Sequence, residues 1–268
     1  MHVLPEVHDS ADHVGLLAAE DIAAGIESAV EAGSSFVLGC PSGRSPLRTY
    51  AHLADLVAKR NLDLSHVIIA LMDEYVVHTA KGFQLVDPKL PHSCVGFGRR
   101  QILDPLNAAA RPEHRIPEQN LWHPDPAAEP GAYDEALAAA GGIDLFLLAS
   151  GASDGHIALN PPGTASDSVT RIVELGEATR RDNLETFPSF RRLDEVPRYG
   201  VTVGTATIRD LSRAVVMVVT GAHKQITVQR VAAADAYEPD WPATVLSDCR
   251  SPRFLADRAA AALLPAAS

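Results

Sequence analysis

Residues 143–162 read IDLFLLASGASDGHIALNPP, an apolar run that leads into a glycine-rich turn. The run IDLFLLAS has the length and composition of a buried β-strand. Asp154 and His156 follow it and flank Gly155. An aspartate within hydrogen-bonding range of an imidazole fixes the tautomer of the ring, as acid/base catalysis by histidine requires. The alternative is an ordinary Asp-Gly turn with an incidental histidine.

Similar apolar runs alternate with helical patterns along the chain. Strands are predicted at 35–40, 66–73, 143–150, 198–204 and 214–222, and helices at 11–33, 45–60 and 223–236. This alternation predicts an α/β fold with a mostly parallel sheet that is covered on both faces. Ligands of such folds bind at the carboxyl ends of the strands. The residues that follow each apolar run are therefore the candidates for a site.

The composition limits the class of protein. The chain has 268 residues, 46% of them hydrophobic, a net charge of −11 and a pI of about 5.4. No basic stripe for nucleic acid, no signal peptide and no run long enough to span a membrane is visible. The cysteines lack metal-site spacing, which favours a reduced, cytoplasmic protein; they are Cys40, Cys94 and Cys249.

The predicted strand at 35–40 leads into the turn GCPSGRSPLRTY. Ser42, Gly43 and Ser45 are small enough for close approach of a ligand to the backbone. A helix that starts at Ser45–Pro46 presents free backbone N–H groups, which bind anions. The turn therefore predicts an anion site, although a plain strand-to-helix turn has the same appearance.

Two further strand ends carry charged side chains. Asp73 and Glu74 follow one strand, and a carboxylate there can act as a general base. Lys224 follows the last strand, in the first turn of a predicted helix, where a cation suits a phosphate. Taken singly, solvated loop carboxylates and a surface lysine are equally ordinary interpretations.

Taken in order, these motifs resemble those of the glucosamine-6-phosphate deaminases, also called isomerases, which are related to the 6-phosphogluconolactonases. The resemblance runs from about residue 35 to 230 and rests on GCPSGRSPLRTY, LMDEYV, DLFLLASGASDGHIALN, ATRRDN, VPRYGVTVGTATI and VTGAHKQ. It implies a single Rossmann-like, doubly wound domain over 1–268, a sugar-phosphate substrate, and no cofactor or metal. Tyr75, where lactonases usually carry arginine, favours the deaminase branch.

The resemblance also implies roles for individual residues. Asp73 matches the base that moves a proton between C2 and C1 of the sugar. His156 matches the catalyst of ring opening, and Asp154 matches its partner. The positions that match phosphate contacts are Ser42, Gly43, Ser45, Arg180 and Lys224.

Two positions depart from the family pattern. Pro161 stands where the deaminases have a glutamate that completes the ring-opening relay, which puts ring opening in question. Arg44 stands where the phosphate loop usually has a small residue, and its guanidinium could bind the phosphate directly.

Three functions are compatible with the sequence. The first is a sugar-phosphate isomerase and deaminase, possibly with another hexose phosphate as substrate. The second is a lactonase-type hydrolase, which needs a histidine but no proton transfer at C2. The third is a sugar-phosphate-binding protein with weakened catalysis. A homo-oligomer is possible, whereas nucleic-acid and membrane partners are not expected.

Overall fold

The computed structural model describes residues 2–264, with only the backbone of residue 185. Within these residues the central sheet has seven strands in the order β1-β11-β10-β7-β2-β3-β6, and every pairing is parallel. The strands are β1 (Glu6–His8), β2 (Phe36–Cys40), β3 (Val67–Leu71), β6 (Leu121–Trp122), β7 (Ile143–Leu148), β10 (Ser212–Val219) and β11 (Pro252–Asp257). The predicted α/β class with a mostly parallel sheet is confirmed.

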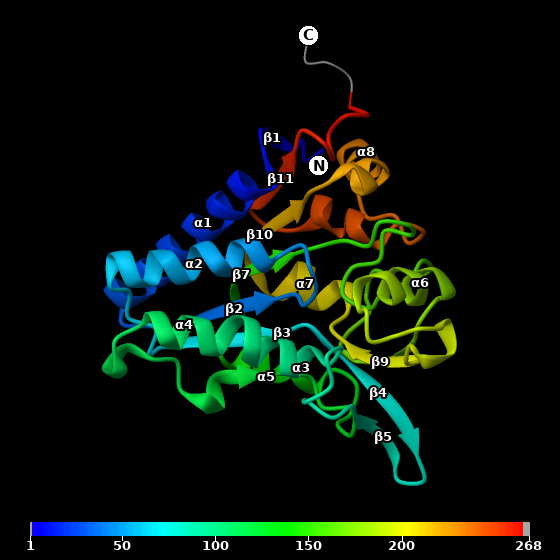
Figure 1. Cartoon of the computed structure of the whole chain (residues 1–268), viewed down its shortest axis with the longest axis horizontal. Helices are drawn as coiled ribbons and strands as arrows, with labels where there is room; N and C mark the ends of the chain where they lie inside the picture. The colour runs from blue at the N-terminus through cyan, green and yellow to red at the C-terminus, as the bar shows by residue number, and fades with distance from the viewer. Residues whose placement is uncertain (1, 265–268) are drawn as a thin grey trace.

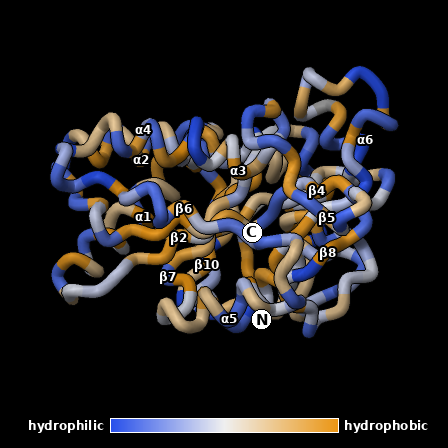
Figure 2. The backbone as a smooth tube through the Cα atoms, turned by 90° about the horizontal axis from the view of Figure 1, so that it is seen from below, coloured by the Kyte–Doolittle hydropathy of each residue, from blue (hydrophilic) through white to orange (hydrophobic). Residues whose placement is uncertain are grey.

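Helices cover both faces of this sheet because alternate strand residues point to opposite sides. Leu145 and Leu147 of β7 pack in one apolar cluster with α1 and α2, whereas Phe146 and Leu148 pack in a second cluster with α7 and α8. Figure 2 shows the hydrophobic strands between α2 and α4 on one side and α5 on the other. The helices are α1 (Ala11–Ala32), α2 (Leu47–Arg60), α3 (Cys94–Phe97), α4 (Asp104–Ala109), α5 (Ala132–Ala139), α6 (Glu177–Thr186), α7 (Thr205–Leu211) and α8 (Gln225–Ala233).

The remaining helical segments are short. They are a π-helical turn η1 (Gly98–Leu103) and the 3₁₀ segments η2 (Pro112–His114), η3 (Glu118–Asn120), η4 (Leu193–Glu195), η5 (Ala222–Lys224) and η6 (Pro242–Asp248). No helix of residues 2–264 is long and apolar enough to cross a membrane.

Helix boundaries follow local capping. The helix predicted at 11–33 is α1, where the Ser10 side chain accepts a hydrogen bond from the His13 amide and Gly33 ends the helix. The helix predicted at 45–60 begins two residues later, at Leu47, because residues 43–46 form a turn first. The turn and the helix start are therefore separate features of the anion-site candidate.

A second, antiparallel sheet projects from the body in the order β5-β4-β9-β8 (Figure 1). Its strands are β4 (Asp73–Thr79), β5 (Gly82–Leu85), β8 (Arg171–Glu174) and β9 (Tyr199–Thr202). The strand predicted at 66–73 is thus divided: the chain leaves the central sheet after Leu71 and enters the second sheet at Asp73. This junction fixes Asp73 between the two sheets.

The strand order locates a crevice. From β2 the chain adds β3 and β6 on one side, then crosses back to add β7 and β10 on the other. Loops that leave β2 and β7 therefore run in opposite directions and open a space at the carboxyl ends of the strands.

Candidate active site

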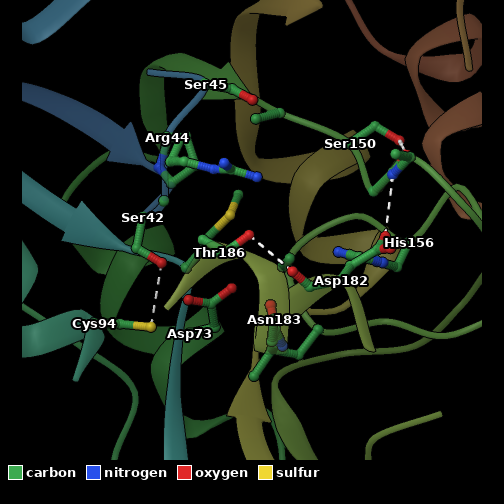
Figure 3. A pocket seen from close by; sticks show the side chains of 18 of the residues that line it. Ser42, Arg44, Ser45, Asp73, Cys94, Ser150, His156, Asp182, Asn183 and Thr186 are labelled. Atoms are coloured by element: carbon green, nitrogen blue, oxygen red, sulfur yellow. Dashed lines mark hydrogen bonds between the residues drawn. The ribbon is translucent and has the colours of Figure 1, made fainter. Parts of the chain in front are cut away.

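A cavity of about 330 Å³ occupies this crevice (Figure 3). Its walls come from the turn after β2, the junction after β3, the loops after β7 and β10, and helix α6. The polar and charged side chains that line it are Ser42, Arg44, Ser45, Asp73, Cys94, Ser150, His156, Asp182, Asn183, Thr186, Thr220, His223 and Lys224. Nearly all of the strand-end candidates therefore meet at one place.

The turn after β2 forms one wall. Gly43 has a φ of +94°, a left-handed conformation that a residue with a side chain rarely adopts. The Ser42 hydroxyl donates to the sulfur of Cys94 over 3.2 Å. The Arg44 side chain extends towards the space that Ser42 and Asp73 border (Figure 3). This wall offers hydroxyl groups and a guanidinium to an anion.

Lys224 adds a buried cation to the same wall. It lies in η5 directly after β10, and its ammonium group donates to the Ser150 carbonyl. The pKa of Lys224 is lowered to about 8, mainly by burial; the charge of Arg44 adds to this shift, while Asp182 and Asp154 oppose it. A bound dianion would compensate the positive charge of the buried ammonium group. The geometry therefore suits a phosphate.

Asp73 reaches the cavity as the first residue of β4. Asp73 is only 6% exposed. Burial raises the pKa of Asp73 to about 7; a hydrogen bond from Cys94 and the charge of His156 oppose the shift, and Glu74 adds to it. A carboxylate with a pKa near neutrality can both accept and return a proton.

Glu74 points the opposite way from Asp73, because successive strand residues alternate in direction. Its carboxylate accepts hydrogen bonds from the Ser93 hydroxyl at 2.5 Å and from the Cys94 and Val95 amides at 2.9 Å each. Glu74 is fully buried and absent from the cavity wall. It holds the start of α3 against β4, so only one of the two adjacent acids is available to a ligand.

Asp154 and His156 form a close pair in the loop after β7. Oδ1 of Asp154 lies 2.6 Å from Nδ1 of His156, and Oδ2 accepts from the Thr179 hydroxyl at 2.8 Å. Burial alone would raise the pKa of Asp154, but the hydrogen bond and charge of His156, with Thr179, lower it to about 2. An ionised Asp154 orients the ring, so Nε2 of His156 is the nitrogen left for a ligand.

Gly155 makes this pairing possible. Its φ is +65°, and a Cβ there would meet the Trp241 indole at 2.4 Å. Both the turn and the close contact therefore exclude a side chain at this position.

Arg180 lies outside the cavity wall. Its Nη2 donates to the Val196 carbonyl at 3.0 Å and also to the Leu193 carbonyl. Arg180 thus ties α6 to the segment that follows it, and the structure does not bring it together with the other predicted phosphate contacts. Pro161 is also absent from the wall, and its carbonyl accepts from Thr164.

Helix α6 contributes cavity residues that the strand-end rule did not find. Asp182, Asn183 and Thr186 face the cavity from one side of this helix (Figure 3). Asp182 and Asn183 belong to the same ATRRDN motif that singled out Arg180. Of this motif, Asp182 and Asn183 line the cavity, whereas Arg180 does not.

One group of possible metal ligands occurs in the described residues, namely Asp154, His156 and Asp182. The 2.6 Å contact between His156 and Asp154 is a hydrogen bond that already occupies Nδ1. The arrangement therefore fits proton transfer better than metal binding.

Comparison with known proteins connects this site to a family. The family model described as glucosamine-6-phosphate isomerases/6-phosphogluconolactonase matches residues 9–254. A glucosamine-6-phosphate deaminase of Bacillus pumilus is 32% identical over 95% of this chain and 97% of its own. One from an Arthrobacter species is 37% identical over 81% of this chain and 75% of its own.

Solved structures agree with the sequence comparison. A monomeric glucosamine-6-phosphate deaminase superposes with a TM-score of 0.81 at 25% identity, covering 97% of this chain and all of its own. A 6-phosphogluconolactonase from Leishmania guyanensis gives a TM-score of 0.70 at 18% identity over 99% of this chain and all of its own, which shows a shared fold. The resemblance in the motifs is confirmed: the chain belongs to the glucosamine-6-phosphate isomerase/6-phosphogluconolactonase family.

Proposed function

We propose that the protein is a glucosamine-6-phosphate deaminase, which isomerises the amino sugar phosphate to the ketose phosphate and releases ammonia. One observation carries the proposal: a buried carboxylate with a pKa near 7, the imidazole that pairs with Asp154 and a cationic wall all face one cavity. The relatives at 32–37% identity carry the same name.

Each group has a separate task in this reaction. The turn Ser42–Ser45 and Lys224 bind the phosphate, which positions the sugar at a distance from the reacting carbons. His156, oriented by Asp154, delivers a proton to the ring oxygen and opens the ring. Asp73 then takes the proton from C2 and returns it to C1, and water replaces the amine at C2 as ammonia leaves.

Asp73 also favours deamination over lactone hydrolysis. Hydrolysis of a lactone needs an activated water but no proton transfer between neighbouring carbons. A carboxylate that is held buried with a raised pKa is costly to the fold, and isomerisation gives it a use. Asp73 is therefore the residue that separates the two reactions.

The test compares Asp73→Asn with Asp55→Asn, an exposed aspartate on α2 that serves as the matched control. Asp73→Asn is expected to lower the kcat for ammonia release at least about 10²-fold, because an amide cannot carry the proton. Asp55→Asn should match wild type. Unchanged ammonia release by Asp73→Asn would refute the proposed role.

Three expectations stay predictions: a single domain over 1–268, a cytoplasmic location and a homo-oligomer. The first of them includes residues 1 and 265–268, which lie outside the described residues.

A further inference from the structure

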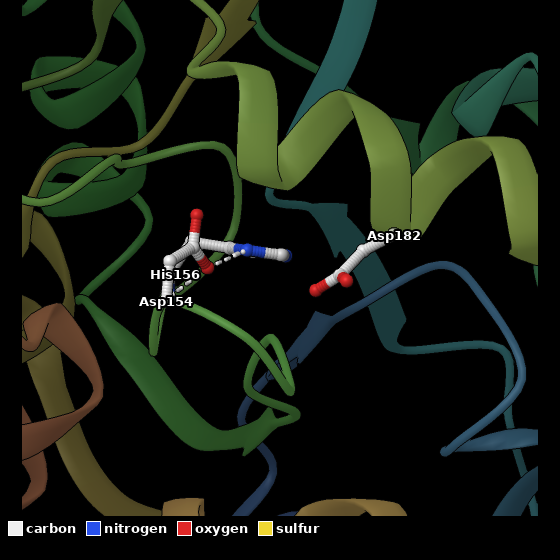
Figure 4. A group of neighbouring side chains, drawn as sticks. All are labelled: Asp154, His156 and Asp182. Carbon is white, nitrogen blue, oxygen red and sulfur yellow. Dashed lines mark hydrogen bonds and ion pairs between the residues drawn. The ribbon is translucent and has the colours of Figure 1, made fainter. Parts of the chain in front are cut away.

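Asp182 lies across the cavity from the Asp154–His156 pair and has no task in the mechanism above (Figure 4). One carboxylate oxygen of Asp182 lies within 4.8 Å of potential ligand atoms of both Asp154 and His156. No ion pair joins Asp182 to His156 in the described part of the chain. The imidazole therefore has one carboxylate bonded at Nδ1 and a second carboxylate on its far side (Figure 4).

Asp182 is held in place by the loop after β7. Its Oδ2 accepts from the Ser153 hydroxyl at 2.9 Å and from the amides of Ala152 and Ser153 at 3.3 and 3.4 Å. Among residues 2–264, every hydrogen bond that the Asp182 carboxylate accepts goes to Oδ2. Oδ1 is thus the oxygen that can receive a ligand, on a carboxylate that is already oriented.

A second, independent observation indicates that a polar ligand binds on this side of the cavity. Nδ2 of Asn183 is buried and has no hydrogen-bond partner among the described residues. Asn183 lines the same cavity as Asp182. A buried amide donor without a partner is unfavourable in a folded protein unless a ligand satisfies it. The neighbouring residues Asp182 and Asn183 therefore offer an acceptor and a donor to one ligand.

We propose that Asp182 is a catalytic residue of ring opening, an inference that rests on the proposed deaminase function. Asp182 removes the proton from the C1 hydroxyl of the cyclic sugar phosphate, while Nε2 of protonated His156 gives a proton to the ring oxygen. The O1–H and C1–O5 bonds break, and the C1=O1 and O5–H bonds form. Return of the proton from Asp182 to His156 through solvent restores both groups, so protons balance.

Ring opening can be measured without ammonia release. An opened sugar re-closes to either anomer, so a protein that opens the ring speeds exchange between the α and β forms of glucosamine 6-phosphate. This exchange is observed by two-dimensional NMR. The variants are Asp182→Asn and Asp182→Ala, with Glu177→Gln as the matched control. Glu177 lies on the same helix but is exposed, in an ion pair with Arg181.

We expect wild type to accelerate anomer exchange, and Asp182→Asn and Asp182→Ala to lower that acceleration at least about 10²-fold. Glu177→Gln should keep it, because Glu177 is exposed and does not line the cavity. In wild type, deuterium at C2 should slow ammonia release; in Asp182→Asn this isotope effect should disappear as ring opening becomes limiting.

Two results would overturn the inference. Anomer exchange at the wild-type rate in a folded Asp182 variant would show that Asp182 does not take the proton. Absence of any acceleration by wild type would show that this site does not open the ring. Failure of the deaminase function is separate, since it would appear as missing ammonia with anomer exchange intact.

Discussion

The substitution Asp73→Asn is expected to make the fold more stable at neutral pH while it removes activity. Asp73 has a pKa of about 7 in the folded protein, against a reference value of 3.8. Between these two values the folded state binds more protons than the unfolded state, so stability falls as pH rises. One pKa unit corresponds to about 1.36 kcal/mol. From pH 5 to pH 7 the cost therefore grows by about 2.3 kcal/mol, and it levels off above about pH 8.

Asparagine does not titrate, so the stability of the variant lacks the pH-dependent loss that ionisation of Asp73 causes. Urea unfolding of both proteins at pH 5, 6, 7 and 8 gives the difference in free energy of unfolding directly. The variant should gain on wild type by about 2.3 kcal/mol between pH 5 and pH 7, with only a small further gain at pH 8. A difference that is independent of pH would refute the raised pKa and with it the argument that Asp73 is a base poised near neutrality.

Other side chains give further expectations. Asp154→Asn should lower kcat for ammonia release about 10²- to 10⁴-fold with a small change in KM, because the imidazole loses its orientation; steady-state kinetics checks this. Lys224→Ala should raise KM for the sugar phosphate about 10- to 10²-fold. Wild-type kcat/KM should rise as Asp73 ionises near pH 7 and fall as Lys224 loses its proton near pH 8, so it should peak between these two pH values. Lys224→Arg should remove the fall above pH 8, because arginine stays protonated. Gly155→Ala should destabilise the protein by more than about 2 kcal/mol in urea unfolding, whereas Gly33→Ala, at a similar φ of +64° but in open space, should cost only about 1 kcal/mol. Arg180→Ala should lower stability by about 1–3 kcal/mol and change KM less than about threefold, because its guanidinium bonds to backbone carbonyls.

The central sheet and its site could be predicted because both depend on local signals. Continuous apolar runs such as 214–219 identify strands that are buried on both faces, and parallel strands bring their carboxyl ends together. That geometric rule is sufficient to gather Ser42, Asp73, His156 and Lys224 around one cavity. None of these residues required knowledge of the tertiary path between the strands.

The second sheet and the role of α6 could not be found in this way. Strands β4, β8 and β9 pair across long separations in sequence, and nothing in the run 66–73 indicates that the chain changes sheets at Met72. Which face of α6 meets the cavity depends on how the segment after it returns to bond with Arg180. The sequence motif therefore identified the helix, but Arg180 is not among the residues that line the cavity.

Pro161 illustrates the same limit. Pro161 stands where the deaminases have a glutamate, and from the sequence alone this difference put ring opening in question. In the structure Pro161 lies off the cavity wall, and Asp182 brings a carboxylate to the far side of His156 from another element. A residue can be judged missing from a relay only after the groups that surround the histidine are known.

The most direct test of the central claim is ammonia release from glucosamine 6-phosphate by the purified wild-type protein, with hydrolysis of 6-phosphogluconolactone measured in parallel. We predict release of ammonia together with an equal amount of ketose phosphate, lost in Asp73→Asn. Lactone hydrolysis without ammonia would contradict the claim, because Asp73 would then have no proton to transfer between C2 and C1.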